Sequence, residues 1–283
     1  MKFSLYSFIF LFVFIQPFSY AATVVLIHGY LSDSSDWKTS KVTQPLKQAG
    51  WVYGGNYTNA RTTQFGVITP PLASLKAKGK KYFTVDLPAD AAIEVQARVL
   101  GFYLQHLYDQ RKEPLVLVGH SAGGIVARAW LTMLNSAPNS ADTPSIATKA
   151  LVTIASPHLG TPLASLASFG SKTPLNEAAR MFGIKNFRRS QAIFADLEEE
   201  KPGNYLYWLN HLQHPSIRYI SVIRRNKKGL LKKFDYVVPR KSQDMNNISA
   251  ISGQSAVYLT VGDHFLNESD GSYIRDLLSK IYQ

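Results

Sequence analysis

Hydrophobic positions follow two different spacings along the chain. Short continuous runs of apolar and β-branched residues recur between longer stretches in which apolar residues lie three or four positions apart. The first spacing is typical of buried strands and the second of amphipathic helices. The predicted strands cover residues 23–27, 51–57, 81–85, 115–118, 150–155, 217–223 and 256–261. Because strands and helices alternate, the pattern predicts an α/β fold with a mostly parallel central sheet flanked by helices.

Apolar residues at helical spacing predict three helices in this framework. The first follows Asp90, whose side chain is suited to cap the first turn, the second covers residues 125–134, and the third follows Asp270. The apolar stripes of the first and third helices are Ile93, Ala97, Leu100, Leu104 and Leu107, and Ile274, Leu277, Leu278 and Ile281.

The alternation of strands and helices stops between residues 160 and 216. Helix start signals at Thr173, Ser190 and Asn204 predict an inserted helical segment there. Insertions on such sheets usually form caps, so we expect a lid over a substrate pocket. The residues expected to line this lid are Phe169, Leu175, Met181 and Phe182. The alternative is that these side chains pack on the core of the domain.

The N-terminal 21 residues are typical of a cleavable signal peptide. Lys2 is followed by a mostly apolar run to residue 18 and then by small residues. This pattern predicts an exported protein, periplasmic or secreted, with one domain over residues 22–283. A membrane anchor is the alternative, but the run is shorter than the ~20 apolar residues of a spanning helix. The chain has no cysteine, so its stability depends on the core and not on disulfides.

The chain is basic, with 31 Lys and Arg against 19 Asp and Glu and a formal net charge of +12. Such a charge favours anionic surfaces, and basic residues are concentrated in the segment 224–241. We expect this basic segment to contact anionic lipid head groups, while the alternative is an ordinary solvated loop. No zinc-finger spacing or RNP-like aromatic motif is present, so a nucleic-acid partner is not expected. The oligomeric state does not follow from the sequence.

The strongest chemical signal lies at residues 115–124. An apolar strand runs into Gly119-x-Ser121-x-Gly123, and a helical segment follows directly. A strand that reverses sharply into a helix needs glycine on both sides of the serine, because side chains there would collide with neighbouring backbone. This arrangement is a nucleophile elbow, and it presents Ser121 as the candidate nucleophile.

A serine nucleophile needs a histidine base oriented by a carboxylate, and in this fold the order along the chain is Ser, acid, His. Of the histidines after Ser121, His264 follows the last predicted strand, where a loop residue reaches back over the elbow. His158 has no acid-bearing strand end before it, and His211 and His214 are expected to face solvent.

The acid is expected near the end of the strand that precedes the last one. Asp235 lies there and is the predicted acid, with Asp244 as the alternative. Asp263 adjoins His264 in sequence, which directs its side chain elsewhere unless the loop turns back on itself.

Acyl transfer also requires two backbone N–H donors for the oxyanion. Ala122, directly after the nucleophile, is expected to supply one. Tyr30, in the turn that follows the first strand, is expected to supply the other, with Gly29 allowing close approach. The alternative for this turn is an ordinary strand end.

These residues together resemble the lipase branch of the α/β-hydrolase superfamily over nearly all of residues 23–283. The matching motifs are His28-Gly29, Gly119-His120-Ser121-Ala122-Gly123-Gly124, the segment 153–162 that contains Ser-Pro-His-Leu-Gly-Thr-Pro, and Asp235-Tyr236-Val237-Val238-Pro239. The resemblance implies an α/β-hydrolase fold and the triad Ser121, Asp235 and His264. Calcium-dependent bacterial lipases of this kind carry an aspartate where this chain has Leu266, so we expect no structural calcium, no other metal and no cofactor.

The sequence therefore predicts an exported serine hydrolase that cleaves lipid or other acyl esters through an acyl-enzyme on Ser121. An acyl thioesterase or an acyltransferase with the same triad is the alternative, because the sequence does not fix what attacks the acyl-enzyme. A binding protein with a hydrolase fold is the non-enzymatic alternative.

Overall fold

The computed structural model describes residues 22–59, 67–136, 146–164, 190–225 and 235–283. The predicted signal peptide lies outside these residues. The four residues predicted to line the lid, Phe169, Leu175, Met181 and Phe182, also lie outside them.

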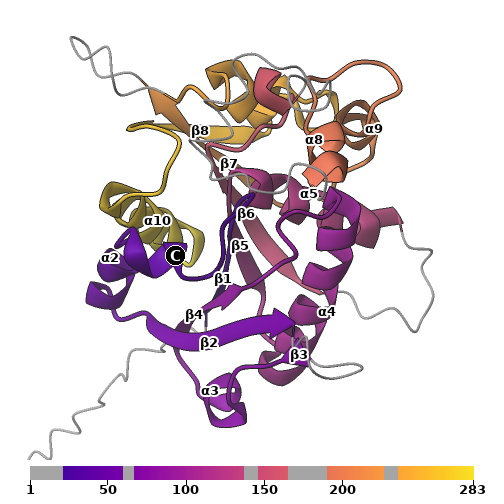
Figure 1. The fold of residues 1–283 in the computed structure, drawn as a ribbon. Coiled ribbons are helices and arrows are strands. Elements are labelled where there is room, and N and C mark those ends of the chain that lie inside the picture. Colours follow the sequence, from indigo (N-terminus) through magenta and orange to yellow (C-terminus); the bar gives the residue numbers. More distant parts are fainter. Residues whose placement is uncertain (1–21, 60–66, 137–145, 165–189, 226–234) are drawn as a thin grey trace, which may run out of the picture.

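The centre of the fold is an eight-stranded sheet in the order β3-β2-β4-β1-β5-β6-β7-β8 (Figure 1). All neighbouring strands are parallel except β2 and β3. The strands are β1 (Ala22–Ile27), β2 (Val52–Asn59), β3 (Val67–Ile68), β4 (Lys80–Val85), β5 (Leu115–His120), β6 (Thr148–Ile154), β7 (Arg218–Arg225) and β8 (Ser255–Val261). The predicted mostly parallel sheet is confirmed, and each predicted strand has a counterpart. The additional strand β3 is too short to produce a pattern in the sequence.

Helices cover both faces of the sheet, and β1 contributes to both layers. Val25 and Ile27 belong to the apolar cluster under α4 (Ile93–Arg111) and α5 (Ala122–Ser136). Val24 and Leu26 belong to the cluster under α2 (Thr43–Gln48) and α10 (Glu268–Ile281). Successive side chains of a strand point to opposite faces, so a fully apolar run is what a strand buried on both sides requires. Figure 1 shows α4 and α5 on one side of the sheet and α2 and α10 on the other.

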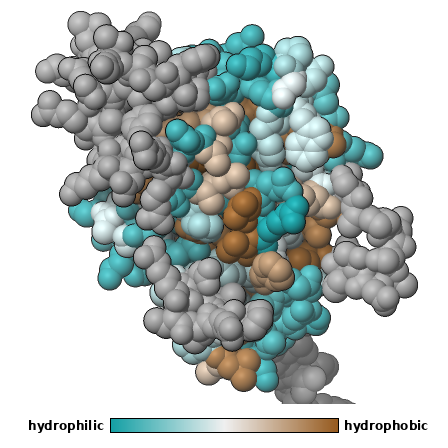
Figure 2. All heavy atoms as spheres, turned by 45° about the vertical axis from the view of Figure 1, so that its right-hand side comes forward, coloured by the Kyte–Doolittle hydropathy of each residue, from teal (hydrophilic) through white to brown (hydrophobic). Residues whose placement is uncertain are grey.

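The remaining helices are short. They are α1 (Asp36–Thr39), α3 (Leu72–Lys76), α8 (Gln191–Asp196), α9 (Tyr205–His211), η2 (Arg240–Gln243), η3 (Met245–Asn247) and η4 (Ser249–Ile251). Ser190 and Asn204 stand at the N-caps of α8 and α9, as predicted. The helix predicted to start at Thr173 lies outside the described residues. Within the described part of the chain, no helix is long and apolar enough to cross a membrane. Hydrophobic residues on the face seen in Figure 2 form small groups among hydrophilic ones.

Two predicted helix starts differ from the structure. The N-cap position of α4 is Ala92, and the N–H of Ile93 donates to Asp196 Oδ2 from α8 at 2.7 Å. The prediction that Asp90 caps this helix is therefore wrong, because a side chain distant in sequence takes its place. The start of α10 is at Glu268, where Asn267 and Asp270 form a reciprocal capping box.

Apolar side chains inside the sheet are expected to provide much of the stability of the domain, and a substitution of Leu117 in β5 tests this expectation. Its side chain is fully buried, so Leu117→Ala should lower the free energy of unfolding by about 2–5 kcal/mol through lost burial and a cavity. Urea denaturation would measure the loss. Val257→Ala on β8, where the side chain is 40% exposed, is the control and should cost less than about 1 kcal/mol. Equal losses in the two variants would contradict this account of the core.

Candidate active site

Ser121 lies at the turn between β5 and α5 with a left-handed backbone, φ 52°. This conformation is costly for a residue with a side chain and persists only where the surrounding structure holds it. Two contacts do so: the N–H of Ser121 donates to the carbonyl of Ile154 on β6 at 2.9 Å, and its own carbonyl accepts from Gly124 at 3.1 Å. Ser121 is partly exposed while most of the residues around it are buried. The turn therefore presents a hydroxyl at the carboxyl edge of the sheet.

The glycines of this turn are required by close backbone contacts. A Cβ on Gly119 would lie 2.5 Å from the backbone nitrogen of Gly124, and one on Gly123 would lie 2.3 Å from the carbonyl oxygen of His28. These contacts are shorter than any side chain tolerates, and backbone atoms do not move aside cheaply. The spacing Gly-x-Ser-x-Gly thus reflects packing of the turn against β1 and against its own helix.

His264 contacts Ser121 from the loop between β8 and α10. Its Nε2 lies 2.8 Å from Ser121 Oγ, and its Nδ1 lies 2.9 Å from Asp235 Oδ2. Since an ionised carboxylate only accepts, Nδ1 carries the proton and Nε2 is free to accept from the serine hydroxyl. The structure thus brings together the three predicted residues in the order hydroxyl, imidazole, carboxylate.

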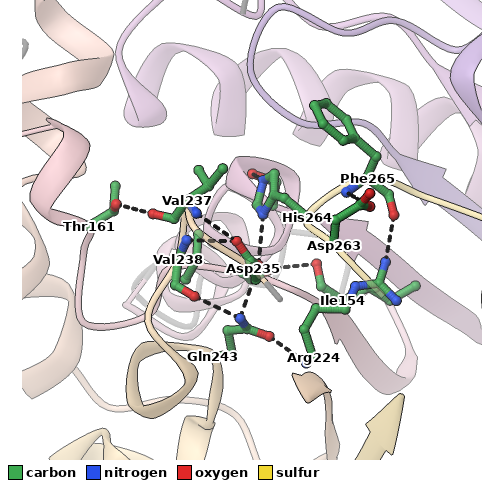
Figure 3. Close-up of polar contacts among 12 residues, drawn as sticks. Ile154, Thr161, Arg224, Asp235, Val237, Val238, Gln243, Asp263, His264 and Phe265 are labelled. Atoms are coloured by element: carbon green, nitrogen blue, oxygen red, sulfur yellow. Dashed lines mark hydrogen bonds and ion pairs between the residues drawn. The ribbon is translucent and has the colours of Figure 1, made fainter. Parts of the chain in front are cut away.

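The segment after residue 234 folds around the carboxylate of Asp235. Its Oδ1 accepts from the backbone N–H groups of Val237 and Val238 at 2.8 and 2.9 Å (Figure 3). Its Oδ2 accepts from Gln243 Nε2 at 3.0 Å in addition to His264. Asp235 does not end a strand, as the sequence had suggested, because β7 stops at Arg225. A turn built on the aspartate itself places the acid.

The two alternative acids make local contacts instead. Asp244 accepts from the N–H of Asn246 at 2.9 Å and stands at the N-cap of η3. Asp263 accepts from the N–H of Phe265 at 3.1 Å. Asp235 also accepts from backbone amides of its own turn, and this local role does not prevent its other oxygen from contacting His264.

Two buried side chains that the sequence analysis did not identify hold the loop of His264. His120 Nε2 donates to the carbonyl of His264 at 2.8 Å, and Arg224 Nη2 donates to the carbonyl of Phe265 at 2.9 Å. The guanidinium of Arg224 also binds both carboxylate oxygens of Asp270 at 2.5 and 2.8 Å, and neither side chain is exposed. These bonds connect β7 to the loop and to the first turn of α10.

The burial of Arg224 corrects one prediction about the basic segment 224–241. Arg224 is only 2% exposed and is paired with Asp270, so its charge is not available to a lipid surface. The physical reason is that a buried guanidinium needs a counterion, which the start of α10 supplies. Arg225, Arg240 and Lys241 are exposed.

The turn after β1 lies against Ser121. A Cβ on Gly29 would lie 2.9 Å from Ser121 Cβ, so the backbone of this turn passes very close to the elbow. His28 holds the turn from below: its Nδ1 pairs with the carbonyl of Gly29 at 2.8 Å and its Nε2 accepts from Leu87 N–H at 2.9 Å. Ala122 begins α5 and is buried. The predicted oxyanion donors are Tyr30 and Ala122. Tyr30 follows Gly29 and Ala122 follows Ser121, so each is next in sequence to one of two residues that lie in close contact.

The Tyr30 side chain connects this turn to α8, which lies within the segment predicted to be inserted. Its hydroxyl donates to Ser190 Oγ at 2.8 Å, and its ring meets that of Phe194 edge to face at 5.2 Å between centroids. Ser190 and Phe194 belong to α8 and its cap.

The other three histidines after Ser121 take no part in this chain of hydrogen bonds. His158 is fully buried and pairs with Thr153 Oγ1 at 3.1 Å. His211 is exposed, as predicted. The prediction that His214 faces solvent is wrong, because its ring is buried near Tyr219 and its Nδ1 pairs with the carbonyl of Leu212. This burial lowers the pKa of His214 to about 4.

The described residues contain no group of three or more His, Cys, Asp or Glu side chains that could hold a metal ion. Leu266, at the position where similar calcium-dependent lipases carry an aspartate, packs against the apolar cluster under α10.

The fold and this site define an α/β protein with a serine at a nucleophile elbow. Residues 24–270 match the alpha/beta hydrolase family, and the protein belongs to that family. No curated protein matches the chain significantly by sequence.

Solved structures of three bacterial proteins share the fold. The mature lipase BlEst2 of Bacillus licheniformis is 16% identical, with 94% of each chain covered and a TM-score of 0.63. The lin2722 product of Listeria innocua is 14% identical, with 92% of this chain and 91% of that chain covered and a TM-score of 0.54. A putative cell surface hydrolase from Lactobacillus plantarum is 15% identical, with 92% and 90% covered and a TM-score of 0.53.

Buried neutral histidines make the stability depend on pH. Burial lowers the pKa of His120 and of His158 well below 6.5, so both are neutral in the folded protein and protonated in the unfolded chain under mild acid. Each should therefore cost about 1.4 kcal/mol of unfolding free energy per pH unit as the pH falls below ~6.5, until the folded form also binds the proton. The urea midpoint should fall between pH 7 and pH 5.

The variant His158→Gln should show a shallower pH dependence by about one proton, because Gln does not titrate. His211→Gln, which changes an exposed histidine, should retain the slope of the wild type. A midpoint that stays constant between pH 7 and pH 5, or an unchanged slope in His158→Gln, would contradict the assignment.

Proposed function

We propose that the protein is an exported serine hydrolase that cleaves carboxylic ester bonds of lipids or other acyl esters. The observation that carries the proposal is the continuous hydrogen-bond chain from Ser121 Oγ through His264 to Asp235 at a strained turn. A serine hydroxyl in a purely structural position has no need of a buried imidazole and a carboxylate in line. Membership of the hydrolase family and the fold shared with a bacterial lipase support the same class.

The geometry suits a double-displacement reaction. Ser121 Oγ attacks the carbonyl carbon of the ester while its proton passes to His264 Nε2, and the carbonyl oxygen becomes an oxyanion. The N–H groups of Tyr30 and Ala122 are the donors proposed for this oxyanion. Collapse of the tetrahedral intermediate breaks the bond to the alcohol, which takes the proton from His264. Water then attacks the acyl-enzyme by the same steps and releases the acid.

Asp235 has an electrostatic and orienting role in this scheme. Its carboxylate keeps the proton of His264 on Nδ1 and faces the imidazolium that forms when the serine loses its proton. The two backbone N–H groups on Oδ1 hold the carboxylate in its orientation toward the imidazole. An asparagine at this position would select the wrong tautomer of the imidazole.

Acyl transfer to a thiol or alcohol, or hydrolysis of a thioester, would use the same residues. The acyl-enzyme is common to all of these reactions, and they differ in the leaving group or in the acceptor. Product analysis in the presence of an added alcohol distinguishes transfer from hydrolysis. A binding protein with this fold would not react with an active-site-directed fluorophosphonate.

The loss of the nucleophile is the direct test of the function. Ser121→Ala should lower kcat/KM on nitrophenyl esters, triglycerides or phospholipids by on the order of 10⁴–10⁶ and should abolish fluorophosphonate labelling. Ser279→Ala on α10, where the residue is exposed, is the matched control and should behave as the wild type. A folded Ser121→Ala variant that keeps its activity or its label would refute the proposed nucleophile.

We further propose that exposed residues beside the site contact an anionic lipid surface. Tyr236 and Phe265, each next in sequence to a residue of the proposed triad, are 56% and 50% exposed. Arg240 and Lys241 are exposed on η2 close by in the chain. Aromatic rings and basic side chains together are the groups that bind a charged bilayer interface.

Vesicle sedimentation tests this contact. Each basic side chain near an anionic bilayer is worth about 1 kcal/mol, so the double variant Arg240→Gln with Lys241→Gln should bind phosphatidylglycerol-containing vesicles roughly 30-fold more weakly at low salt. The double variant Lys38→Gln with Lys47→Gln, which removes two exposed charges from α1 and α2, should bind as the wild type. Equal binding of the wild type to neutral phosphatidylcholine vesicles would rule out an electrostatic contact.

A further inference from the structure

Gln243 is the last residue of η2, and its buried side-chain amide hydrogen-bonds to the carboxylate of Asp235 and to backbone groups next to it. It is 1% exposed. Its Oε1 accepts from the backbone N–H of Arg224 at 2.8 Å, and its Nε2 donates to Asp235 Oδ2 at 3.0 Å and to the carbonyl of Val238 at 2.9 Å. Figure 3 shows the amide between Asp235 and Arg224.

These partners fix the orientation of the amide. Oε1 faces an N–H, which only donates, and both hydrogens of Nε2 face oxygens that only accept. A rotation of the amide by half a turn would place oxygen against two acceptors and leave a buried N–H without a partner. Gln243 therefore presents a donor, and not an acceptor, to the carboxylate.

The oxygen that Gln243 contacts is the one that also receives His264 Nδ1. Oδ1 of Asp235 is held by two backbone N–H groups, so the donor from Gln243 is the additional bond on the side of the imidazole. A donor on Oδ2 has two effects. It fixes the rotation of the carboxylate toward the histidine, and it withdraws charge from the oxygen that stabilises the imidazolium.

Gln243 also links the acid to the strand that holds the base. The backbone of Arg224 binds Gln243, and the guanidinium of the same residue binds the loop of His264 through the carbonyl of Phe265. One residue at the end of β7 thus holds both partners of the hydrogen bond between Asp235 and His264. A shift of the carboxylate relative to the imidazole would require one of these buried bonds to break.

We propose that Gln243 is a positioning residue that sets the orientation and basicity of Asp235 toward His264. This inference rests on the proposed function, because it assigns to Gln243 a part in the proton transfer from Ser121. A solely structural role, in which Gln243 only joins β7 to the segment 235–238, would make the same contacts but would not affect the titration of the imidazole.

The test replaces the amide by an apolar group of similar length. In Gln243→Met the carboxylate loses one donor and becomes more basic, so the imidazolium is stabilised and the acidic limb of kcat/KM should move to higher pH. We expect a shift of about half to one pH unit, which corresponds to one hydrogen bond. The carboxylate also loses a bond that fixes its orientation, so kcat should fall about tenfold. Gln243 is only 1% exposed, so KM should stay within about twofold.

Proton NMR gives a second reading that does not require activity. The downfield resonance of His264 Nδ1–H reports the bond to Asp235, and the pH midpoint of its change should rise in Gln243→Met by the same amount. If Gln243→Met does not fold, Gln243→Asn replaces it, since the shorter amide does not span from Arg224 to Asp235. The matched control is Gln96→Met, which removes a buried amide in the first turn of α4 that donates to the carbonyl of Ala91.

The outcomes separate the two proposals. A folded Gln243 variant with the acidic limb and the NMR midpoint of the wild type would overturn the positioning role, and an equal shift in Gln96→Met would do the same. If the wild type cleaves no ester but the NMR midpoint responds to Gln243→Met, the positioning of Asp235 stands and the proposed substrate class fails.

Discussion

The left-handed backbone at Ser121 is the constraint on which the arrangement of the site depends. The turn reverses the chain from the centre of the sheet into α5 in a single residue, and close contacts with the end of β1 and with the backbone of α5 leave room only for glycine on either side. Because β5 is paired on both edges and buried on both faces, the turn has a rigid support. The strain is therefore retained by the packing of the sheet, and the hydroxyl keeps one position relative to the ends of the neighbouring strands.

The base and the acid reach that hydroxyl from loops, so they need separate supports. A loop has more freedom than a strand, and a displacement of about 1 Å at a reacting group is costly. The buried pair of Arg224 and Asp270 supplies the support for His264, and its desolvation cost is offset by a bidentate contact and by further bonds to Thr260 and the loop backbone. The turn of Asp235 is closed by its own carboxylate. Buried polar bonds thus hold the loops of His264 and Asp235 in place relative to the sheet.

The sequence predicted the sheet and the elbow because both depend on local patterns. The apolar runs of β1 and β5, and glycine on each side of Ser121, are visible without knowledge of any distant contact. Asp235 and His264 are predicted from chain order, from the expected strand ends and from the resemblance of the motifs, and the structure places their side chains in contact. The roles of Arg224 and Gln243 could not be predicted, because nothing local marks them. Arg224 binds Gln243 and Asp270, which lie 19 and 46 positions away in sequence, and Gln243 reaches Asp235 across a turn and η2. For the same reason the local sequence favours Asp90 as the cap of α4, whereas the first N–H of that helix donates to Asp196, 103 positions away.

Among the described residues, Asp235 is the carboxylate that hydrogen-bonds to the imidazole of His264, and the basic groups near it are neutral or paired. His120, whose ring lies 5.3 Å from that of His264, is kept neutral because burial and then the neighbouring His264 lower its pKa. Burial likewise lowers the pKa of His28 beneath the elbow. The positive charge of Arg224 is neutralised by Asp270 at bonding distance, so it adds little repulsion at the base. A like charge this close in a poorly solvated site would oppose protonation of the imidazole, and proton transfer from a serine hydroxyl depends on that protonation. The buried histidines therefore contribute hydrogen bonds to the frame of the site without contributing charge to it.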